Sequence, residues 1–313
     1  MVKEKKLVEA PLFRDPIYDG PTDPTVIWNR EEKSFYMFYT QRRSTDVQVG
    51  YSSIHGSKIG VASSMDGTRW LYRGTLPELD FEPGHNTFWA PEIIWAEGAY
   101  HMYVTYITGI PTDWNYERKI LHYTADNLWK WNYEGEIKLS SNRVIDACVC
   151  EVAPKVYKMW YKDEVDQCYT YSAISSDLYQ WEVLGPEITD CPHEGPNVFE
   201  LGGKKWMVTD FWSGLAVYRS EDFSTWSRCS NILDTPGSRP LDHTIGHHAD
   251  VVVAGDEAYI FYFCHPYETK IEEWPSNGKE ALTVIQAAKI TTDGNQLICN
   301  RDENFEWKFI ETR

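Results

Sequence analysis

Hydrophobic and polar positions alternate in short runs along nearly the whole chain, and these runs recur in a similar order five times. Each copy starts at an acidic or proline-marked turn, continues through aromatic-rich runs and leads to a tryptophan. The clearest copies read DPTVIW…SFYMFYT…IGVASSMDGTRW, APEIIW…AYHMYVTY…ILHYTADNLWKW and GPNVFEL…KKWMVTD…LAVYRSEDFSTW. Short strands repeated at this spacing are typical of a propeller, in which each copy forms one four-stranded blade.

The repeat therefore predicts an all-β fold, a five-bladed β-propeller in which each blade is a four-stranded antiparallel sheet. Residues 1–313 are expected to form a single domain, with blades starting near residues 23, 90, 146, 194 and 247. Almost nothing in the pattern is helical. The leading segment LVEAPLFRD is expected to pair with the last blade, because closing the ring removes exposed strand edges.

Three copies end with an aspartate four residues before a tryptophan. The pairs are Asp66 and Trp70, Asp177 and Trp181, and Asp222 and Trp226. An aspartate that caps its own turn, followed by a tryptophan that packs between blades, accounts for this spacing. We therefore interpret the three aspartates as turn residues and not as catalysts.

The composition limits the expected binding partners and the expected cellular compartment of the protein. The net charge is −17 and no basic stripe is visible, so neither nucleic acid nor an anionic membrane is expected as a partner. The N-terminus MVKEKKLVEAPLF is positively charged but lacks the apolar stretch of a signal peptide. The chain as given is expected in the cytoplasm, or in the periplasm or outside the cell if a leader was removed. Its oligomeric state is left open.

The cysteines do not suggest a structural framework. Seven of them are scattered without a CxxC pair, which argues against disulfide staples and against a zinc site. Cys148 and Cys150 alternate with apolar residues, so both are expected to be reduced strand residues.

Three carboxylates stand at predicted blade starts: Asp23 in TDPTV, Asp146 in VIDACV and Glu194 in HEGPNV. Because the first strand of a blade lines the central channel, the three groups are expected to face one another across it. Sugar hydrolysis requires two carboxyls beside a glycosidic bond, one to protonate the leaving oxygen and one to activate water or attack. A third negative charge nearby would raise the pKa of the acid and keep it protonated.

The ordered motifs DPTV, FWAPEI, VID, EGPNVF and GHHADVV resemble those of the five-bladed propeller glycosidases of glycoside hydrolase family 43 and the related family 117. The resemblance covers essentially the whole chain and implies a glycosidase that hydrolyses O-glycosyl bonds with inversion. It implies that Asp23 is the general base, that Glu194 is the general acid and that Asp146 tunes the acid. It implies an oligosaccharide substrate and no required cofactor, and it allows a structural calcium or sodium ion in the central channel.

Two neighbouring residues leave the catalytic roles open. Asp19 lies four residues before Asp23 and is the alternative base. His193 directly precedes Glu194, and relatives in family 117 can use a histidine as the acid.

Further side chains are expected to reach the substrate. Trp89 and Trp212 are candidates to stack on sugar rings or to pack between blades. Only one of His247 and His248 can point inward on a strand, and the resemblance suggests His248 as a metal ligand or a buried histidine. The candidate substrate-binding residues are Asp19, Arg42, Trp89, Glu92, Trp212, Arg239, His247 and His248, with Arg43, Lys162 and Asp163 as weaker candidates.

The expected activity is exo-acting hydrolysis of a terminal sugar from a plant or algal oligosaccharide. Predicted long loops at 75–88, 107–118 and 265–281 would shape the pocket, so the sugar and the linkage stay open. The alternative is a non-catalytic propeller that binds glycans or proteins, because propellers host many functions. Transfer of the sugar to phosphate is not favoured, because the sequence shows no recognisable binding pocket for the phosphate anion.

Overall fold

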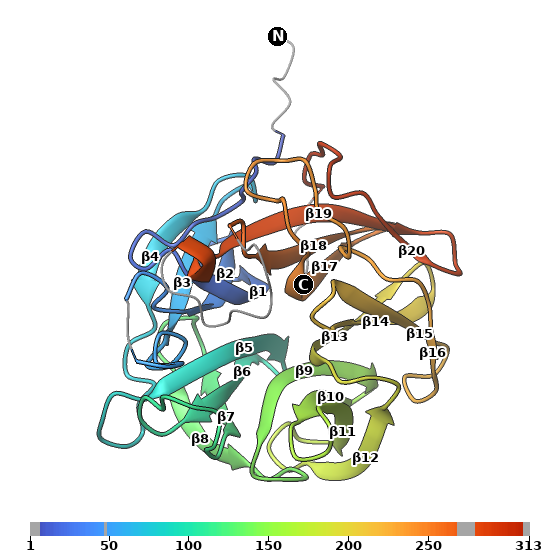
Figure 1. The fold of residues 1–313 in the computed structure, drawn as a ribbon. Coiled ribbons are helices and arrows are strands. Elements are labelled where there is room, and N and C mark those ends of the chain that lie inside the picture. The colour runs from blue at the N-terminus through green and yellow to red at the C-terminus, as the bar shows by residue number, and fades with distance from the viewer. Residues whose placement is uncertain (1–6, 47–48, 268–278, 309–313) are drawn as a thin grey trace.

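Five four-stranded antiparallel sheets form a ring in the computed structural model, which describes residues 7–46, 49–267 and 279–308 (Figure 1). Within every sheet the strands pair in chain order, so each sheet is a simple meander. The first strand of each blade lies nearest the centre of the ring, and the fourth lies at its periphery (Figure 1). The prediction of an all-β, five-bladed propeller is confirmed.

The blades follow one another along the chain. Blade one contains β1 (Pro21–Asn29), β2 (Ser34–Gln41), β3 (Lys58–Ser64) and β4 (Leu71–Thr75). Blade two contains β5 (Thr87–Ala96), β6 (Ala99–Ile107), β7 (Lys119–Ala125) and β8 (Asn132–Ile137). Blade three contains β9 (Val144–Ala153), β10 (Val156–Asp163), β11 (Tyr169–Ser175) and β12 (Glu182–Ile188). Blade four contains β13 (Glu194–Leu201), β14 (Lys204–Asp210), β15 (Leu215–Ser220) and β16 (Trp226–Arg228). Blade five contains β17 (His247–Ala254), β18 (Glu257–Cys264), β19 (Val284–Thr292) and β20 (Leu297–Cys299).

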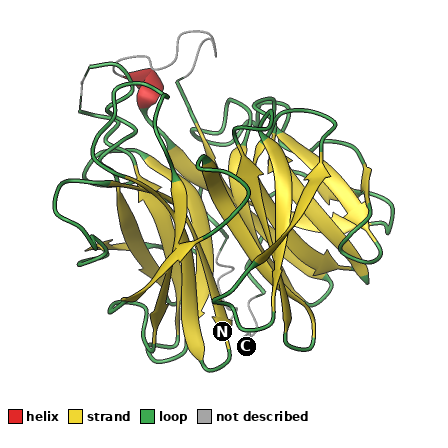
Figure 2. Cartoon of the chain, turned by 90° about the horizontal axis from the view of Figure 1, so that it is seen from below, coloured by secondary structure: helices red, strands yellow, loops and turns green. Residues whose placement is uncertain are grey.

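The N-terminal segment closes the ring against blade five. Phe13 and Ile285 exchange two backbone hydrogen bonds, of 3.1 and 3.0 Å, and Leu7 forms a second antiparallel bridge with Glu306. The predicted pairing of LVEAPLFRD with the last blade is therefore confirmed. Seen from the side, the strands run between the two faces of the ring, and the 3₁₀ helix η2 (Lys279–Ala281) lies among the loops of one face (Figure 2). The part of the chain that the structure describes contains no helix of a length and apolarity suited to crossing a bilayer.

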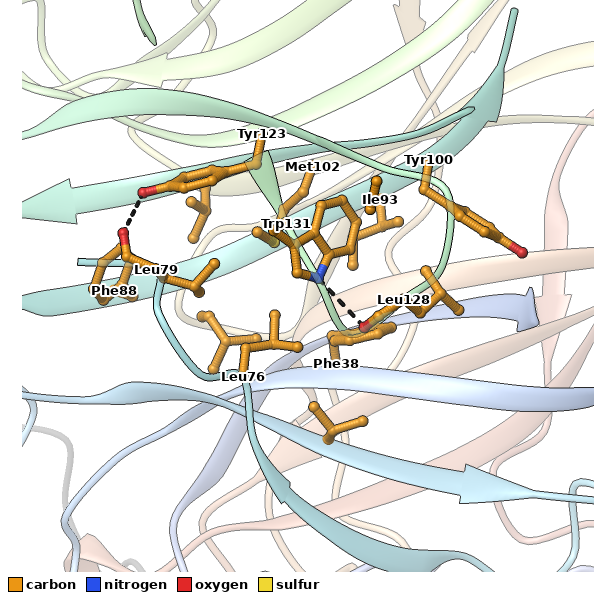
Figure 3. Packing of buried hydrophobic residues seen from close by; sticks show 14 of the residues in the cluster. Phe38, Leu76, Leu79, Phe88, Ile93, Tyr100, Met102, Tyr123, Leu128 and Trp131 are labelled. Atoms are coloured by element: carbon orange, nitrogen blue, oxygen red, sulfur yellow. Dashed lines mark hydrogen bonds between the residues drawn. The ribbon is translucent and has the colours of Figure 1, made fainter. Parts of the chain in front are cut away.

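Hydrophobic clusters fill the spaces between blades. Figure 3 shows the cluster between blades one and two, where aromatic and aliphatic side chains interlock. Two of its polar side chains are bonded locally: the hydroxyl of Tyr123 donates to the carbonyl of Leu79 at 2.6 Å, and Nε1 of Trp131 donates to the carbonyl of Leu128 at 3.3 Å. Large aromatic rings, some with a bonded polar end, therefore fill the space between blades one and two.

The predicted turn aspartates serve the backbone. Oδ1 of Asp177 accepts the N–H groups of Tyr179 and Gln180, both at 2.8 Å, and the following Trp181 donates to the carbonyl of Leu178. Asp66 and Asp222 accept backbone N–H groups in the same way. Their interpretation as turn residues is confirmed. The loops expected at 75–88 and 107–118 are present as 76–86 and 108–118, whereas part of the third, 268–278, lies outside the described residues.

Every innermost strand shifts its pairing register near its beginning. At these shifts the backbone is left-handed at Asp23 (φ 50°), Ala90 (φ 45°), Asp146 (φ 59°) and Gly195 (φ 56°). A proline follows three of the four residues, and proline suits a position where no ladder hydrogen bond is required. Such a bulge changes the direction of the side chains around it, and here the bulges lie near the beginning of each innermost strand.

Candidate active site

A cavity of about 350 Å³ opens where the innermost strands begin. Its wall combines acidic, basic and aromatic side chains from all five blades and their loops. The lining residues are Asp23, Arg42, Ile54, Trp89, Trp114, Ile145, Asp146, Lys162, Glu164, Glu194, Trp212, His247, His248, Phe263 and His265. A cavity of this size, largely apolar with a few polar groups, is typical of a small-molecule site.

The three sequence-selected carboxylates all line this cavity. Asp23 and Asp146 are 7% and 5% exposed, and the Glu194 side chain is 25% exposed. Asp23 and Asp146 occupy the left-handed position of their strands, whereas Glu194 precedes the left-handed Gly195 by one residue. Glu194 thus stands one residue before the position that Asp23 and Asp146 occupy in their strands, and its side chain still lines the cavity.

His248 stands between two of these carboxylates. Its Nδ1 lies 3.4 Å from Oδ1 of Asp23 and 3.9 Å from Oδ2 of Asp146. The ring also packs against Gly195, where an added Cβ would lie only 2.7 Å from the imidazole. The glycine of the EGP motif is therefore required both for its left-handed backbone and for the space that His248 occupies.

Burial and neighbouring charges give Asp23, Asp146 and His248 different pKa shifts. Burial alone would raise the pKa of Asp23, but Arg42 and the hydrogen bond from His248 outweigh it and hold that pKa well below its ordinary value. Burial raises the pKa of Asp146 to about 7, even with His248 beside it. Burial would lower the pKa of His248, but Asp23 and Asp146 raise it to about 9. Near neutral pH the site thus holds an ionised Asp23, an imidazolium and a readily protonated Asp146.

Glu194 faces a different cation. Nζ of Lys162, on β10, lies 2.9 Å from Oε2 of Glu194 and 2.9 Å from Oε1 of Glu164. The same ammonium group lies 5.2 Å from the ring centroid of Trp212. Lys162 is 3% exposed, so this ion pair is shielded from water on most sides.

Side chains of neighbouring blades hold the backbone of the site. Oγ1 of Thr105 accepts the N–H of Asp146 at 3.1 Å. Asp210 accepts the N–H of His248 at 3.1 Å and lies 3.0 Å from Nδ1 of His247. The carboxylates and the histidine are therefore positioned before any ligand arrives. Both histidines line the cavity, so the expectation that only one of them points inward is wrong, because the strand register shifts between His247 and Ala249.

Aromatic rings line the remaining walls. Trp89 is 8% exposed and donates its Nε1 to the carbonyl of Ile54 at 2.7 Å, so most of its surface is used in packing. Trp114, from the 108–118 loop, is 41% exposed. The Arg42 guanidinium lies 5.3 Å from the ring centroid of Phe263, which orients it beside Asp23.

Three predicted substrate-binding residues lie outside the cavity lining. Asp19 accepts from Nε of Arg14 at 3.0 Å. Arg239 is buried and donates to the carbonyl of Ala287 at 2.7 Å. Glu92 is half-buried between innermost strands, where it accepts the N–H of Val149 at 2.8 Å. These three side chains serve other parts of the fold.

The remaining candidates, which are the alternative acid His193 and the possible ligand contacts Arg43, Lys162 and Asp163, divide in the same way. His193 is fully buried and lies 2.6 Å from Oγ1 of Thr170, away from the cavity lining. Arg43 donates to the carbonyl of His55, and Asp163 accepts from serine hydroxyls, so neither lines the cavity. Of this group only Lys162 reaches it.

His248 directs Nδ1 toward the carboxylates of Asp23 and Asp146, at 3.4 and 3.9 Å, so a metal ion bound at this nitrogen would have to displace these contacts. Deeper between the innermost strands, Asn197 donates to Asp250 at 3.0 Å, while Oδ1 of Asn197 is buried without a partner among the described residues. Carboxylate and amide oxygens are the ligands that calcium prefers, so a hard cation would fit near Asp250 and Asn197 better than at His248.

Sequence reasoning missed several lining residues. Glu164 is the last residue of YKDE, two positions after Lys162, and charged residues directly after a predicted strand were the available signal. Trp114 lies in a predicted loop without any repeat partner. The other missed residues are apolar or buried: Ile54, Ile145, Phe263 and His265.

No protein-family model matches the chain, and no curated protein sequence matches it. Solved structures do share its fold. A thermostable family-43 glycoside hydrolase is 16% identical with a TM-score of 0.62, over 92% of this chain and 95% of that one. A family-43 β-1,3-galactosidase with galactodeoxynojirimycin is 12% identical with a TM-score of 0.68, over 95% and 100%.

A third structure is a family-43 β-xylosidase/α-arabinofuranosidase from a compost microbial metagenome, in complex with xylotriose and in a calcium-free form. It is 14% identical with a TM-score of 0.68, over 93% of this chain and 98% of that one. At these identities the likeness concerns the fold. The chain has the five-bladed propeller fold of the family-43 glycoside hydrolases.

Proposed function

We propose that the protein is an exo-acting glycoside hydrolase that removes a terminal sugar from an oligosaccharide with inversion. One observation carries the proposal: Asp23, Asp146 and Glu194, from three different blades, line a single cavity. The fold shared with family-43 hydrolases and the aromatic walls support a sugar as the ligand.

The chemistry is a single displacement. Asp23 accepts a proton from a water molecule, whose oxygen attacks the anomeric carbon. The bond to the leaving oxygen breaks, its electron pair stays on that oxygen, and Glu194 donates the proton that neutralises it. Asp146 and His248 set the charge balance between base and acid. Inversion requires room for the water, so we expect a separation of about 6.5–9.5 Å between the two catalytic carboxyls in the substrate complex.

The pKa of Asp146 makes this residue a competing candidate for the general acid. Asp146 has a pKa of about 7, whereas Glu194 is paired with an ammonium group. We assign Glu194 as the donor because it is the more accessible carboxyl of the two. Asp146 then tunes the acid through its charge, because an ionised Asp146 beside Glu194 favours the protonated form of Glu194.

A panel of nitrophenyl glycosides and matching oligosaccharides tests the proposal. Neighbouring structures include a β-xylosidase, an α-arabinofuranosidase and a galactosidase, so these three sugars come first, followed by plant and algal oligosaccharides. Release of a monosaccharide by the wild type, lost in Glu194→Gln, supports the proposal. Binding of an oligosaccharide without release of any sugar would favour the glycan-binding alternative.

The acid is identified by its dependence on the leaving group. A nitrophenolate leaves without protonation, whereas a sugar hydroxyl does not, so the acid variant keeps activity on the aryl glycoside and loses it on the oligosaccharide. Glu194→Gln is expected to show this pattern. If Asp146→Asn shows it instead, the roles of the two carboxyls are exchanged.

A further inference from the structure

Lys162 is the one lysine among the described lining residues of the cavity, and its side chain is 4% exposed. A buried ammonium is costly unless it is paired. Burial would lower its pKa, but Glu194 and then Glu164 outweigh that effect and raise the pKa above its ordinary value. Lys162 is therefore a permanent positive charge in contact with the proposed proton donor.

Glu164, the second carboxylate bound to Lys162, is itself held in place. Oε2 of Glu164 forms an ion pair with Nε of Arg118, whose side chain is 4% exposed. The guanidinium stacks on Tyr116 at 4.7 Å, and its Nη2 donates to the carbonyl of Trp114 at 3.3 Å. A chain of alternating charges thus runs from the 108–118 loop through Lys162 to Glu194.

We propose that Lys162 is a positioning residue for the proton donor: it orients the Glu194 carboxyl and stabilises the carboxylate that remains after the proton has left. This inference rests on the proposed function of Glu194. Glu164 acts through Lys162, because it shares the ammonium charge with Glu194 and so weakens the pull of that charge on the donor's proton. Neither Lys162 nor Glu164 takes part in forming or breaking a bond.

The leaving group distinguishes this role from a structural one. Without Lys162, proton donation leaves an uncompensated carboxylate in the cavity, which matters only when the leaving oxygen needs the proton. Lys162→Met should therefore lower kcat about tenfold to a hundredfold on the oligosaccharide, and less than about threefold on the nitrophenyl glycoside of the same sugar. Lys162→Arg should recover part of the loss, because it restores the charge.

The pH profile gives a second readout with opposite signs. In Lys162→Met the donor loses its cation and keeps its proton to higher pH, so the alkaline limb of the oligosaccharide profile moves up. In Glu164→Gln the ammonium faces Glu194 alone, so the alkaline limb moves down. A general loosening of the cavity would not move the two limbs in opposite directions. The titratable groups that face Lys162 and Glu194 are Asp146, Glu164, Cys168, His193 and His248, and of these only Glu164 is altered in this pair of variants.

Lys158 provides the matched control. It lies on the same strand, is 4% exposed and pairs with a largely buried carboxylate, Glu187, whose side chain is 11% exposed, but it does not line the cavity. Lys158→Met should lower the melting temperature at least as much as Lys162→Met, with no preference between the two substrates and no shift of the pH limb. Glu164→Gln and Lys162→Arg keep the test decisive if Lys162→Met does not fold.

The outcomes separate this inference from the proposed function. If Glu194→Gln depends on the leaving group but Lys162→Met affects both substrates equally, the inference about Lys162 is overturned and the function stands. If Glu194→Gln itself shows no dependence on the leaving group, or the wild type releases no sugar, the assigned role of Glu194 fails and the inference fails with it.

Discussion

Two glutamates seven residues apart show how one residue type serves two purposes. Glu187, on β12, has both carboxylate oxygens occupied: Ser172 and Lys158 on one, and Nε1 of Trp160 and of Trp226 at 2.8 and 3.0 Å on the other. Glu194 is bonded through one oxygen to Lys162 and faces the cavity.

The difference teaches how the two regions divide stability and reactivity. The Glu187 carboxylate, which accepts from four donors, is a fixed cross-link between blades three and four and has no free lone pair for chemistry. Glu194 lies where the strand register shifts and the next residue is left-handed, and the fold leaves its other oxygen available. Incomplete pairing at a strained strand end is what we expect of a functional group.

The largest expected effect is on turnover. Glu194→Gln should lower kcat on the oligosaccharide by roughly a hundredfold or more, because proton donation to the leaving oxygen is lost. Its melting temperature should stay close to that of the wild type. Steady-state kinetics with a thermal melt check both, and a variant that kept full turnover would refute the role of Glu194.

Glu187→Gln should show the reverse pattern. Lys158 would lose its counter-charge in a buried site, so the free energy of unfolding should fall by roughly 3–5 kcal/mol. The turnover of the folded fraction should change little, because Glu187 does not line the cavity. Denaturant unfolding and activity per folded molecule measure the two quantities. A large fall in turnover with unchanged stability would erase the contrast with Glu194.

The pH dependence of stability sharpens the same contrast at His248. Its pKa is raised to about 9 from an ordinary value near 6.5, so its stabilisation is fully present below pH 6.5 and is lost as pH rises through 9. The loss should reach up to about 3 kcal/mol for a shift of this size. The ring signals of His248, assigned by their absence in His248→Gln, should titrate near pH 9. A titration near 6.5 would contradict the pairing with Asp23 and Asp146.

The smallest effect is expected at the rim. Trp114 is 41% exposed and lies in the cavity wall, so Trp114→Ala should raise KM for an oligosaccharide by a few-fold to tenfold with little change in kcat. KM for a nitrophenyl monosaccharide should change less, because this shorter substrate has fewer sugar rings that could contact Trp114. A fall in kcat alone would place Trp114 in the chemistry and not in binding.

Much of the fold was readable from the sequence because the repeat imposes it. Strand alternation, the Asp-to-Trp turns and the closing N-terminal segment all follow from local patterns. Asp23 and Asp146 were predicted near blade starts, and each is the third residue of the first strand of its blade, whereas the bulges at these positions were not predicted. Glu194 was found by its motif, although its position precedes that of the other two by one residue.

The rest of the site depends on contacts that no local pattern encodes. Arg42 and Arg239 are alike as sequence candidates, yet only Arg42 reaches the cavity, because Arg239 is taken up by the carbonyl of Ala287. Glu164 becomes important only because Lys162 turns inward and Arg118, 46 positions earlier, meets it. Loop residues such as Trp114 are placed by packing between blades.

The stereochemistry of the first product tests the central claim most directly. Proton NMR, recorded within minutes of adding wild-type protein to the oligosaccharide that it cleaves, reports which anomer is released before mutarotation. A cavity in which Asp23 activates water and Glu194 protonates the leaving group predicts release of the anomer opposite to that of the substrate. Release of the same anomer would mean direct attack by a carboxylate and would contradict the proposed division of roles.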